Sequence, residues 1–571
     1  MKPEKLTKKQ KEELEKFGAN TWFVESLYKQ YEQKPDEVSD QWKNFFGNVE
    51  NKNKPNVSKE NESVGFLTIP KNIEMPKPSD EDDVKVIAGS AQRILDNMNS
   101  SLTIPVATSQ RTIAVKLLEE NRIIINQHLQ RKNEGKISFT HLISWAILKG
   151  ISKIPSMNNG YTIIDGKPNI IIRKNINLGL AIDIERKDGT RSLLVPNIKA
   201  ANKLNFKEFW KTYEDIVVRS RKGTIDPAEF LGTTVTLTNP GTIGTVSSIP
   251  RLMIGQGAII ATGVIQYNAE YQAMSSATIS SLGISKVMNI TSTYDHRIIQ
   301  GAESGMFLRE INELLLGKDG FYEEIFSSLK IPSRPMQWES DYQPGGFDNA
   351  ISTDEIIKQA KVLQLINMYR VRGHLLADLD PLGTRSVYHP ELDPSSFNLT
   401  VWDLDRHFVT GGFGALKTAT LREVINILQK TYCEKIGVEY MHIQNPAEKV
   451  WLQSKMEPLQ NSPKYNDDVK KNILNKLIKA ELFENFVHTK FIGHKRFSLE
   501  GSETLIPVMD KILNQASEHG IDEIVLGMSH RGRLNVLTNI IGKSYESIFS
   551  EFEDIKDPNT IQGSGDVKYH L

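Results

Sequence analysis

The stretch 293–308 reads TYDHRIIQGAESGMFL and places His296 between a predicted strand and a predicted helix. A histidine at the end of a strand is well placed to meet a ligand. Its unperturbed pKa of about 6.5 lets it take a proton from a thiol, whose pKa is about 8.5. Transfer of an acyl group between two thiols needs such a base and also a donor for the oxyanion. These residues alone leave a structural role for His296 equally open.

An upstream segment, VTLTNPGTIG at 235–244, supplies a candidate donor. Alternation puts Val235 and Leu237 on one strand face and Thr238 on the other. A hydroxyl at that position can donate to an oxyanion. The same pattern is also typical of an ordinary half-buried strand rich in threonine.

The surrounding residues, 87–317, are expected to form one mixed α/β unit. Strict alternation in INLGLAIDI, residues 176–184, predicts a strand with one apolar face. A helix near 205–220 carries aromatic and aliphatic residues on one stripe. The other predicted elements are helices near 109–131, 141–150 and 302–316, and strands near 233–239, 258–265 and 286–293.

Two motifs in this unit resemble the dihydrolipoyl acyltransferases, the E2 components of 2-oxo acid dehydrogenase complexes. That family carries D-H-R-x-x-D-G and T-[IL]-[ST]-N-x-G, and here the residues are DHRIIQG at 295–301 and TLTNPG at 236–241. The resemblance implies a fold like that of chloramphenicol acetyltransferase, CoA as a substrate, His296 as base and Thr238 as oxyanion donor. Gln300 departs from the family, which usually has Asp there. A missing carboxylate beside the histidine is expected to alter its orientation or proton affinity.

A second group of candidates lies in EIVLGMSHRGRLNVLTNIIG, residues 523–542. The pattern predicts an apolar strand over 523–528, a basic turn and a helix, and ligands of α/β folds sit at the carboxyl ends of strands. His530, Arg531 and Arg533 suit a dicarboxylate or a phosphate, because a guanidinium pairs with either in a bidentate way. A solvated basic turn is the alternative interpretation.

Four motifs stand out in the later part of the chain: YRVRGHLLADLDPLG at 369–383, KRFSLEGSETLIP at 495–507, MSHRGRLNVL at 528–537 and GSGDVKYHL at 563–571. They resemble 2-oxoglutarate dehydrogenase E1, an enzyme that depends on thiamine diphosphate and Mg²⁺. By that resemblance His530 contacts the 2-oxo acid, and Arg496 is a second candidate for the same site. The combination is similar to the multifunctional 2-oxoglutarate dehydrogenases of actinobacteria and some other bacteria, in which an E2-like domain is fused to E1.

The resulting fold class is α/β multidomain. A chloramphenicol-acetyltransferase-like mixed α/β domain is followed by a helical segment and the start of a thiamine-diphosphate-binding α/β domain. Aromatic residues over 17–46 predict two short helices that either pack on this protein's own body or dock on a partner. The expected parts are a helical N-terminal docking segment (1–47), a flexible linker (48–86), the E2-like catalytic domain (87–320), a second linker (321–350) and the N-terminal part of E1 (351–571).

The cofactor pattern of E1 is missing. Thiamine-diphosphate enzymes use a G-D-G motif followed farther along by Asn, whereas only four residues follow Gly565-Asp566-Val567. We therefore expect an incomplete E1 that needs the remainder of E1, and that does not decarboxylate 2-oxoglutarate by itself. No D-K-A-like lipoyl turn is present, so a lipoyl-bearing E2 and a dihydrolipoyl dehydrogenase (E3) are expected partners. The E1 resemblance implies a homodimer when the enzyme is complete.

The amino-acid composition argues against several other kinds of function. Lys+Arg and Asp+Glu both total 70, so no global field favours nucleic acid or an anionic membrane. Cys433 is the single cysteine, which excludes an internal disulfide and is consistent with the cytoplasm. The most apolar run, 252–264, is too short to span a bilayer. Two hypotheses remain: succinyl transfer between dihydrolipoamide and CoA at His296, with succinyl-CoA and 2-oxoglutarate as the substrates of the two halves, or an E2-like scaffold that Gln300 has silenced.

Overall fold

The structure is a computed structural model, and it divides the chain into two compact units, Met1–Asn461 and Ser462–Leu571. Each unit is described by itself below. The described residues are 17, 21–35, 38–51, 78–79, 81–84, 86, 90–185, 191–341, 353–380, 382, 388–492 and 497–553.

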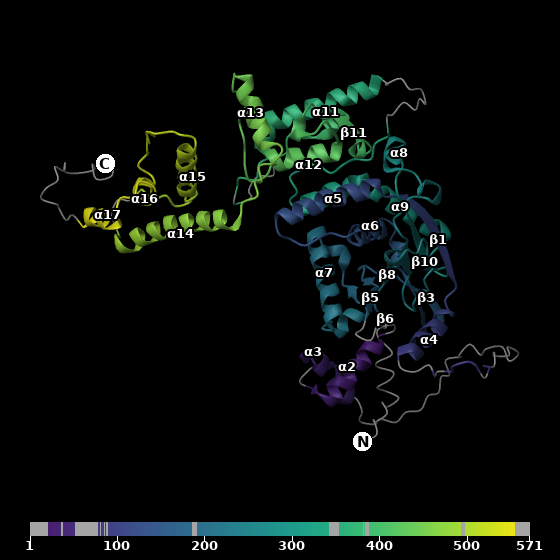
Figure 1. Ribbon diagram of the computed structural model, residues 1–571. Helices are drawn as coiled ribbons and strands as arrows, with labels where there is room; N and C mark the ends of the chain where they lie inside the picture. The colour runs from purple at the N-terminus through teal and green to yellow at the C-terminus, as the bar shows by residue number, and fades with distance from the viewer. Residues whose placement is uncertain are drawn as a thin grey trace. The chain divides into compact units, whose positions relative to one another are not determined.

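A six-stranded mixed sheet forms the centre of the first unit (Figure 1). Its middle strand, β9, is buried along its whole length and is almost wholly apolar, as expected for a strand that is covered on both faces. It pairs in parallel with β8 and antiparallel with β10. The order across the sheet is β1 (Val106–Ala114), β10 (Val287–Asp295), β9 (Ala258–Thr262), β8 (Val235–Thr238), β4 (Leu178–Leu180) and β7 (Asn197–Ile198).

The helices of this domain pack tightly around α6. Gly150 on α6 lies so close to α9 that a Cβ there would sit 3.1 Å from the Phe307 ring. On α7, Phe206 and Phe209 contact the Trp145 ring at centroid distances of 5.6 and 5.4 Å. Large side chains thus fill the core between the helices and the sheet. The helices are α5 (Lys116–Arg131), α6 (Phe139–Lys153), α7 (Phe206–Lys222), α9 (Gly301–Leu315) and α10 (Phe321–Ser328).

Most elements of the domain agree with the expectations, with two corrections. The strand expected over 176–184 is divided into β4 of the main sheet and β5 (Ile182–Glu185), which pairs with β6 (Arg191–Leu194) in a separate sheet. The predicted helix near 109–131 is wrong over its first turns, because residues 106–114 form the edge strand β1 and the helix begins at Lys116. Every residue of β1 pairs with β10, from Val106 opposite Asp295 to Ala114 opposite Val287. An edge strand tolerates polar residues on its exposed side, so its sequence lacks the alternation of a half-buried strand.

The N-terminal helices α2 (Thr21–Gln33) and α3 (Asp40–Asn51) pack on the protein's own body. Trp42 is 1% exposed, and its indole N–H donates to the Ile225 carbonyl over 2.8 Å. Phe23 contacts Phe230 at a ring-centroid distance of 5.7 Å. Of the two alternatives raised for this aromatic segment, packing on its own chain is confirmed for these side chains.

Ordered structure continues into the stretch that was expected to be the second linker. The helix α10 occupies 321–328 and buries Phe321, Tyr322, Ile325 and Phe326. These four side chains recur at helical spacing, so they extend the core past the expected boundary at 320.

The rest of the first unit is mainly helical and packs against α5. Arg422 of α12 donates to both oxygens of the buried Glu120, with Nη2 2.7 Å from Oε1. Lys116 pairs with Asp405 over 2.5 Å. These buried pairs join the α/β domain to the helices that follow it, which are α11 (Thr353–Arg372), α12 (Leu421–Tyr432) and α13 (Pro446–Met456), with a small sheet of β11 (His407–Val409) and β12 (Thr418–Thr420).

In the second unit the described residues form helices around two small apolar clusters. Ala480, Leu499, Ile506 and Val536 make one of them. Residues 523–528, which were expected to form a strand, are extended but pair with no other strand among the described residues, and Val525 is 99% exposed. A strand needs a hydrogen-bonded neighbour, so that expectation is corrected. The helices are α14 (Asp467–Lys490), α15 (Leu505–Glu518), α16 (Arg533–Asn539) and α17 (Tyr545–Phe552).

Candidate functional site

His296 follows directly after β10 and is exposed. Its backbone N–H donates to the Pro105 carbonyl over 2.9 Å, which ties the end of β10 to the residue before β1. Tyr294 stands edge-on to the imidazole, with 5.6 Å between ring centroids. The fold therefore holds the backbone of His296 in place and exposes the imidazole just past the carboxyl end of β10.

The tautomer of His296 follows from its hydrogen bond. Nδ1 lies 3.0 Å from the Ile299 carbonyl oxygen. A carbonyl oxygen only accepts, so Nδ1 carries the proton and donates it there, which leaves Nε2 with a lone pair. This is the form of histidine that accepts a proton from a substrate.

Asp295 and Arg297, the neighbours of His296, pair with each other instead of with the imidazole. Arg297 donates to Asp295 through Nε at 2.9 Å and Nη2 at 2.7 Å. The guanidinium also covers the ring of Tyr161, with Cζ 3.7 Å from the centroid. The Asp295 contact raises the pKa of Arg297. The pair locks the turn that holds His296, a role that sequence reasoning did not assign.

Gln300, which stands where the related family has Asp, is the N-cap of α9. Its backbone N–H donates to Glu303 Oε2 over 2.7 Å. Because the Ile299 carbonyl holds Nδ1 of His296, the orientation of the imidazole in this structure rests on the backbone and not on the side chain at 300. The side chain of Gln300 therefore takes no part in the hydrogen bond at Nδ1.

Thr238 ends β8, as predicted, and is half-buried. No described residue forms a hydrogen bond with its hydroxyl. The hydroxyl of Thr236, on the same strand face, donates to Gln256 Oε1 over 2.8 Å. Just after the strand, Gly241 approaches Gly263 so closely that a Cβ would lie 2.3 Å from the Gly263 carbonyl oxygen. The hydroxyl of Thr238 is thus available for a ligand beside a tightly packed turn.

The register of the sheet separates Thr238 from His296 within one chain. Thr238 lies opposite Ala261, and Ala261 lies opposite Thr291 of β10. His296 is five residues beyond Thr291, a displacement of about 17 Å at 3.4 Å per residue. The two candidates therefore lie toward opposite ends of the sheet, and one copy of the chain does not bring them together.

His530 lies in the second unit, at the exposed turn before α16. Its ring stands 4.4 Å from the ring of Phe497, and the Gly532 N–H donates to the Phe497 carbonyl over 2.8 Å. Arg533 donates from Nη2 to the Met528 carbonyl over 2.9 Å, so its role here is to hold the turn. Arg496, the other predicted substrate contact, lies outside the described residues, as does the stretch 563–571.

Nowhere in the described residues do three or more His, Cys, Asp or Glu side chains gather as ligands for a metal ion. Among the described helices, none combines the length and apolar character needed to cross a membrane.

Comparisons with known proteins agree with both halves of the sequence interpretation. Residues 79–319 match the catalytic domain of the 2-oxoacid dehydrogenases acyltransferases, and residues 16–53 match the 2-oxoglutarate dehydrogenase N-terminus. A "Multifunctional 2-oxoglutarate metabolism enzyme" of Mycolicibacterium vanbaalenii is 51% identical over 496 residues, which cover 86% of this chain and 39% of the relative. A "2-oxoglutarate dehydrogenase E1/E2 component" of Corynebacterium glutamicum is 45% identical over 97% of this chain and 47% of its own length.

The chain thus spans less than half the length of these two curated relatives. Among solved structures, a probable dihydrolipoamide acetyltransferase from Listeria monocytogenes is 23% identical, with a TM-score of 0.36, over 42% of this chain and 95% of that chain.

Proposed function

Residues 79–319 belong to the 2-oxoacid dehydrogenase acyltransferase catalytic domains, and on that premise we propose that the chain transfers a succinyl group between dihydrolipoamide and CoA, with His296 as general base. The observation that carries the proposal is the exposed imidazole whose Nδ1–H is held by the Ile299 carbonyl. Nε2 is thereby kept ready to accept a proton. The choice of succinyl rests on the match of residues 16–53 to 2-oxoglutarate dehydrogenase.

The reaction is a proton transfer coupled to thioester exchange. Nε2 of His296 takes the proton of the attacking thiol, and the thiolate adds to the carbonyl carbon of the succinyl thioester. The Thr238 hydroxyl donates a hydrogen bond to the oxyanion of the tetrahedral intermediate. Collapse of the intermediate breaks the original C–S bond, and the leaving thiolate takes the proton back from the imidazolium.

The register of the sheet supports a site shared between copies of the chain. Thr238 and His296 are about 17 Å apart along the strand direction, counted at 3.4 Å per residue, whereas a base and an oxyanion donor act on atoms of one thioester. We place His296 of one copy opposite Thr238 of another. The homodimer expected from the E1 resemblance meets the minimum of two copies.

The second half of the proposal concerns residues 351–571, which we assign to the N-terminal part of a 2-oxoglutarate dehydrogenase E1. There His530 contacts the 2-oxo acid, with Arg496 as a second contact. Thiamine diphosphate, with Mg²⁺, supplies the decarboxylation chemistry when bound, and no residue of this chain is assigned to it. The partners are the remainder of E1, a lipoyl-bearing E2 that supplies the lipoyl group, and E3, all in the cytoplasm.

A catalytically silent scaffold is the second candidate function, and Gln300 is the observation that favours it. The first measurement is CoA release by the purified chain supplied with succinyl-CoA and dihydrolipoamide. We expect turnover that falls about a thousandfold in His296→Ala. The control His442→Ala removes an exposed histidine outside the site and should keep wild-type activity. A folded wild-type chain without turnover would establish the scaffold instead.

A further inference from the structure

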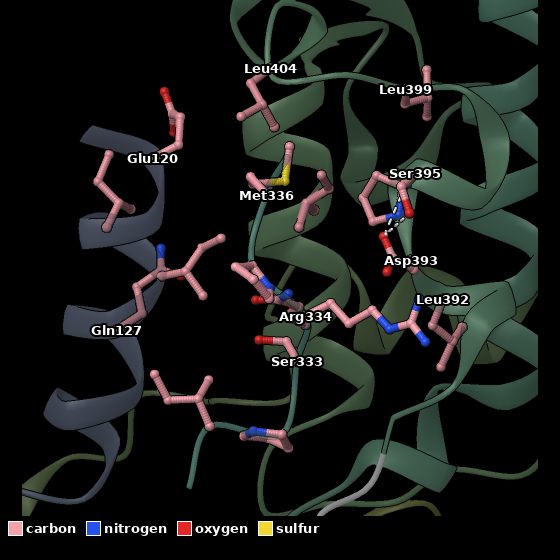
Figure 2. A pocket seen from close by; sticks show the side chains of 18 of the residues that line it. Glu120, Gln127, Ser333, Arg334, Met336, Leu392, Asp393, Ser395, Leu399 and Leu404 are labelled. Atoms are coloured by element: carbon pink, nitrogen blue, oxygen red, sulfur yellow. Dashed lines mark hydrogen bonds between the residues drawn. The ribbon is translucent and has the colours of Figure 1, made fainter. Parts of the chain in front are cut away.

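A cavity that His296 does not line lies in the seam between α5 and α12 (Figure 2). It encloses about 200 Å³. One wall is α5, which lies within the residues that match the acyltransferase family, and a second is α12, which lies outside them. The segment 331–339 and the stretch 388–404 supply most of the remaining lining.

One end of the cavity holds the exposed side chain of Arg334. Arg334 reaches across it toward Leu392 (Figure 2), and its Cζ lies 4.3 Å from the centroid of the Tyr388 ring. No carboxylate among the described residues forms an ion pair with this guanidinium. The nearby Asp393 accepts hydrogen bonds from neutral donors, the Tyr388 hydroxyl at 3.1 Å and the Ser395 N–H at 3.0 Å, and forms no ion pair with Arg334.

The two other arginines of the lining both have acidic partners, and Arg131 pairs with Glu434 over 3.6 Å. Arg422 is neutralised by Glu120, which accepts from both of its terminal nitrogens. Arg334 has no such partner in the described part of the chain, although a guanidinium pairs well with a carboxylate. Its position over an aromatic ring fixes the guanidinium plane without supplying a counter-charge.

The lining also contains Arg131, which pairs with Glu434, and the exposed carboxylate of Glu339, while the rest is mostly apolar or neutral. Gln127 and Asn426 bond each other across the two walls over 3.3 Å. Burial, followed by the charges of Lys132 and Arg131, lowers the pKa of His128 to about 4, so this histidine is neutral near pH 7. The apolar part of the wall consists of Ile123, Ile124, Met336, Leu399, Leu404 and Ile425.

We propose that this seam is a binding site for a small organic carboxylate, with Arg334 pairing with the carboxylate and the aliphatic wall covering the apolar body. Of the arginines in the lining, Arg334 is the one without an ion pair among the described residues, and its guanidinium beside an aliphatic wall favours an anion that also has apolar surface. An inorganic anion gains nothing from the aliphatic wall, and a neutral alcohol gains nothing from Arg334. Because the walls come from two parts of the chain, the ligand stabilises their association.

The test is isothermal titration of the full 571-residue chain with hexanoate, with 1-hexanol and acetate as matched probes. We expect saturable binding of hexanoate, no saturable binding of 1-hexanol or acetate, and a rise in melting temperature with hexanoate alone. Arg334→Gln should weaken hexanoate binding about tenfold, the equivalent of one charge-assisted hydrogen bond. Arg309→Gln, which removes an equal charge from an exposed position on α9, should leave binding unchanged.

A second variant tests the cavity itself. Ile425→Phe adds volume inside the cavity and should abolish hexanoate binding. A melting curve followed by circular dichroism checks that this variant still folds. Absence of saturable hexanoate binding, or equal affinity in Arg334→Gln and Arg309→Gln, would overturn the proposal. Unchanged affinity in Ile425→Phe would place the ligand elsewhere and overturn it as well.

Discussion

At position 532 two independent features require glycine. Gly532 has φ of +75°, and a Cβ built on it would lie 2.5 Å from Cδ1 of Leu499. The left-handed backbone and the overpacking against a buried leucine together predict that Gly532→Ala lowers the free energy of unfolding by about 2–3 kcal/mol. Urea unfolding, followed by a signal from the second unit, measures the change.

A second glycine, Gly542, allows the cost of backbone strain to be measured apart from the cost of overpacking. It also has a positive φ, +85°, but nothing lies within 4 Å of its Cβ position. Gly542→Ala should therefore cost about 1 kcal/mol from backbone strain alone. Equal losses in the two variants would show that Leu499 moves away without cost. Because the Gly532 N–H bonds Phe497, which contacts His530, the larger loss should also perturb the predicted substrate turn.

Single residues could be predicted from the sequence where a motif names them. DHRIIQG singled out His296 and TLTNPG singled out Thr238, and both lie at strand ends as expected. The distance between them could not be predicted, because it depends on the pairing of β8, β9 and β10 over 50 residues and more. Nor could the backbone carbonyl of Ile299 be identified as the partner of His296, since every residue has a carbonyl.

Among the secondary-structure elements, the pair α2–α3 depends on one buried indole. In Trp42→Phe the ring still fills the space between the helices, but the Ile225 carbonyl loses its donor. A buried acceptor left without a partner costs about 1.4 kcal/mol or more, which is about a tenfold increase in local opening. Hydrogen exchange of residues 21–51 should therefore be faster in the variant.

The matched control for that change is Trp451→Phe. Trp451 lies on α13 and is 60% exposed, so its indole is not confined to a buried site. Hydrogen exchange of residues 21–51 should match wild type in this variant. If Trp42→Phe also leaves the exchange unchanged, the Ile225 hydrogen bond does not hold the N-terminal helices on the domain.

Helices and strands could be predicted where burial in the core gives the apolar residues a regular spacing. The prediction failed where no such spacing exists. The helix α7 and the strand β9 followed their apolar patterns closely. The edge strand β1 was mistaken for helix because polar residues occupy its exposed side. Residues 523–528 have strand composition, yet composition does not supply the neighbouring strand that a ladder requires.

On the scale of the whole chain, the joint between the acyltransferase domain and the helices after it is ionic. Glu120 is 3% exposed and Asp405 binds both Lys116 and Arg422. Removing Arg422 would leave the buried carboxylate of Glu120 with one fewer partner, which is strongly destabilising for a buried charge. These ion pairs couple α5 to α12 and so place the proposed carboxylate site where it senses the association of these parts. Sequence patterns gave no sign of this joint, because its partners are about 300 positions apart along the chain.

A site shared between copies makes a quantitative prediction for mixed assemblies. His296→Ala and Thr238→Ala should each be inactive alone, because every site then lacks the base or the oxyanion donor. Refolded or co-expressed together in equal amounts, they should recover about a quarter of wild-type activity, since each site draws its histidine and its threonine independently from two copies. CoA release from succinyl-CoA and dihydrolipoamide measures the recovery. A mixture as inactive as its parents would mean that both residues act within one chain, and would require a movement of about 17 Å along β10, as counted from the strand rise.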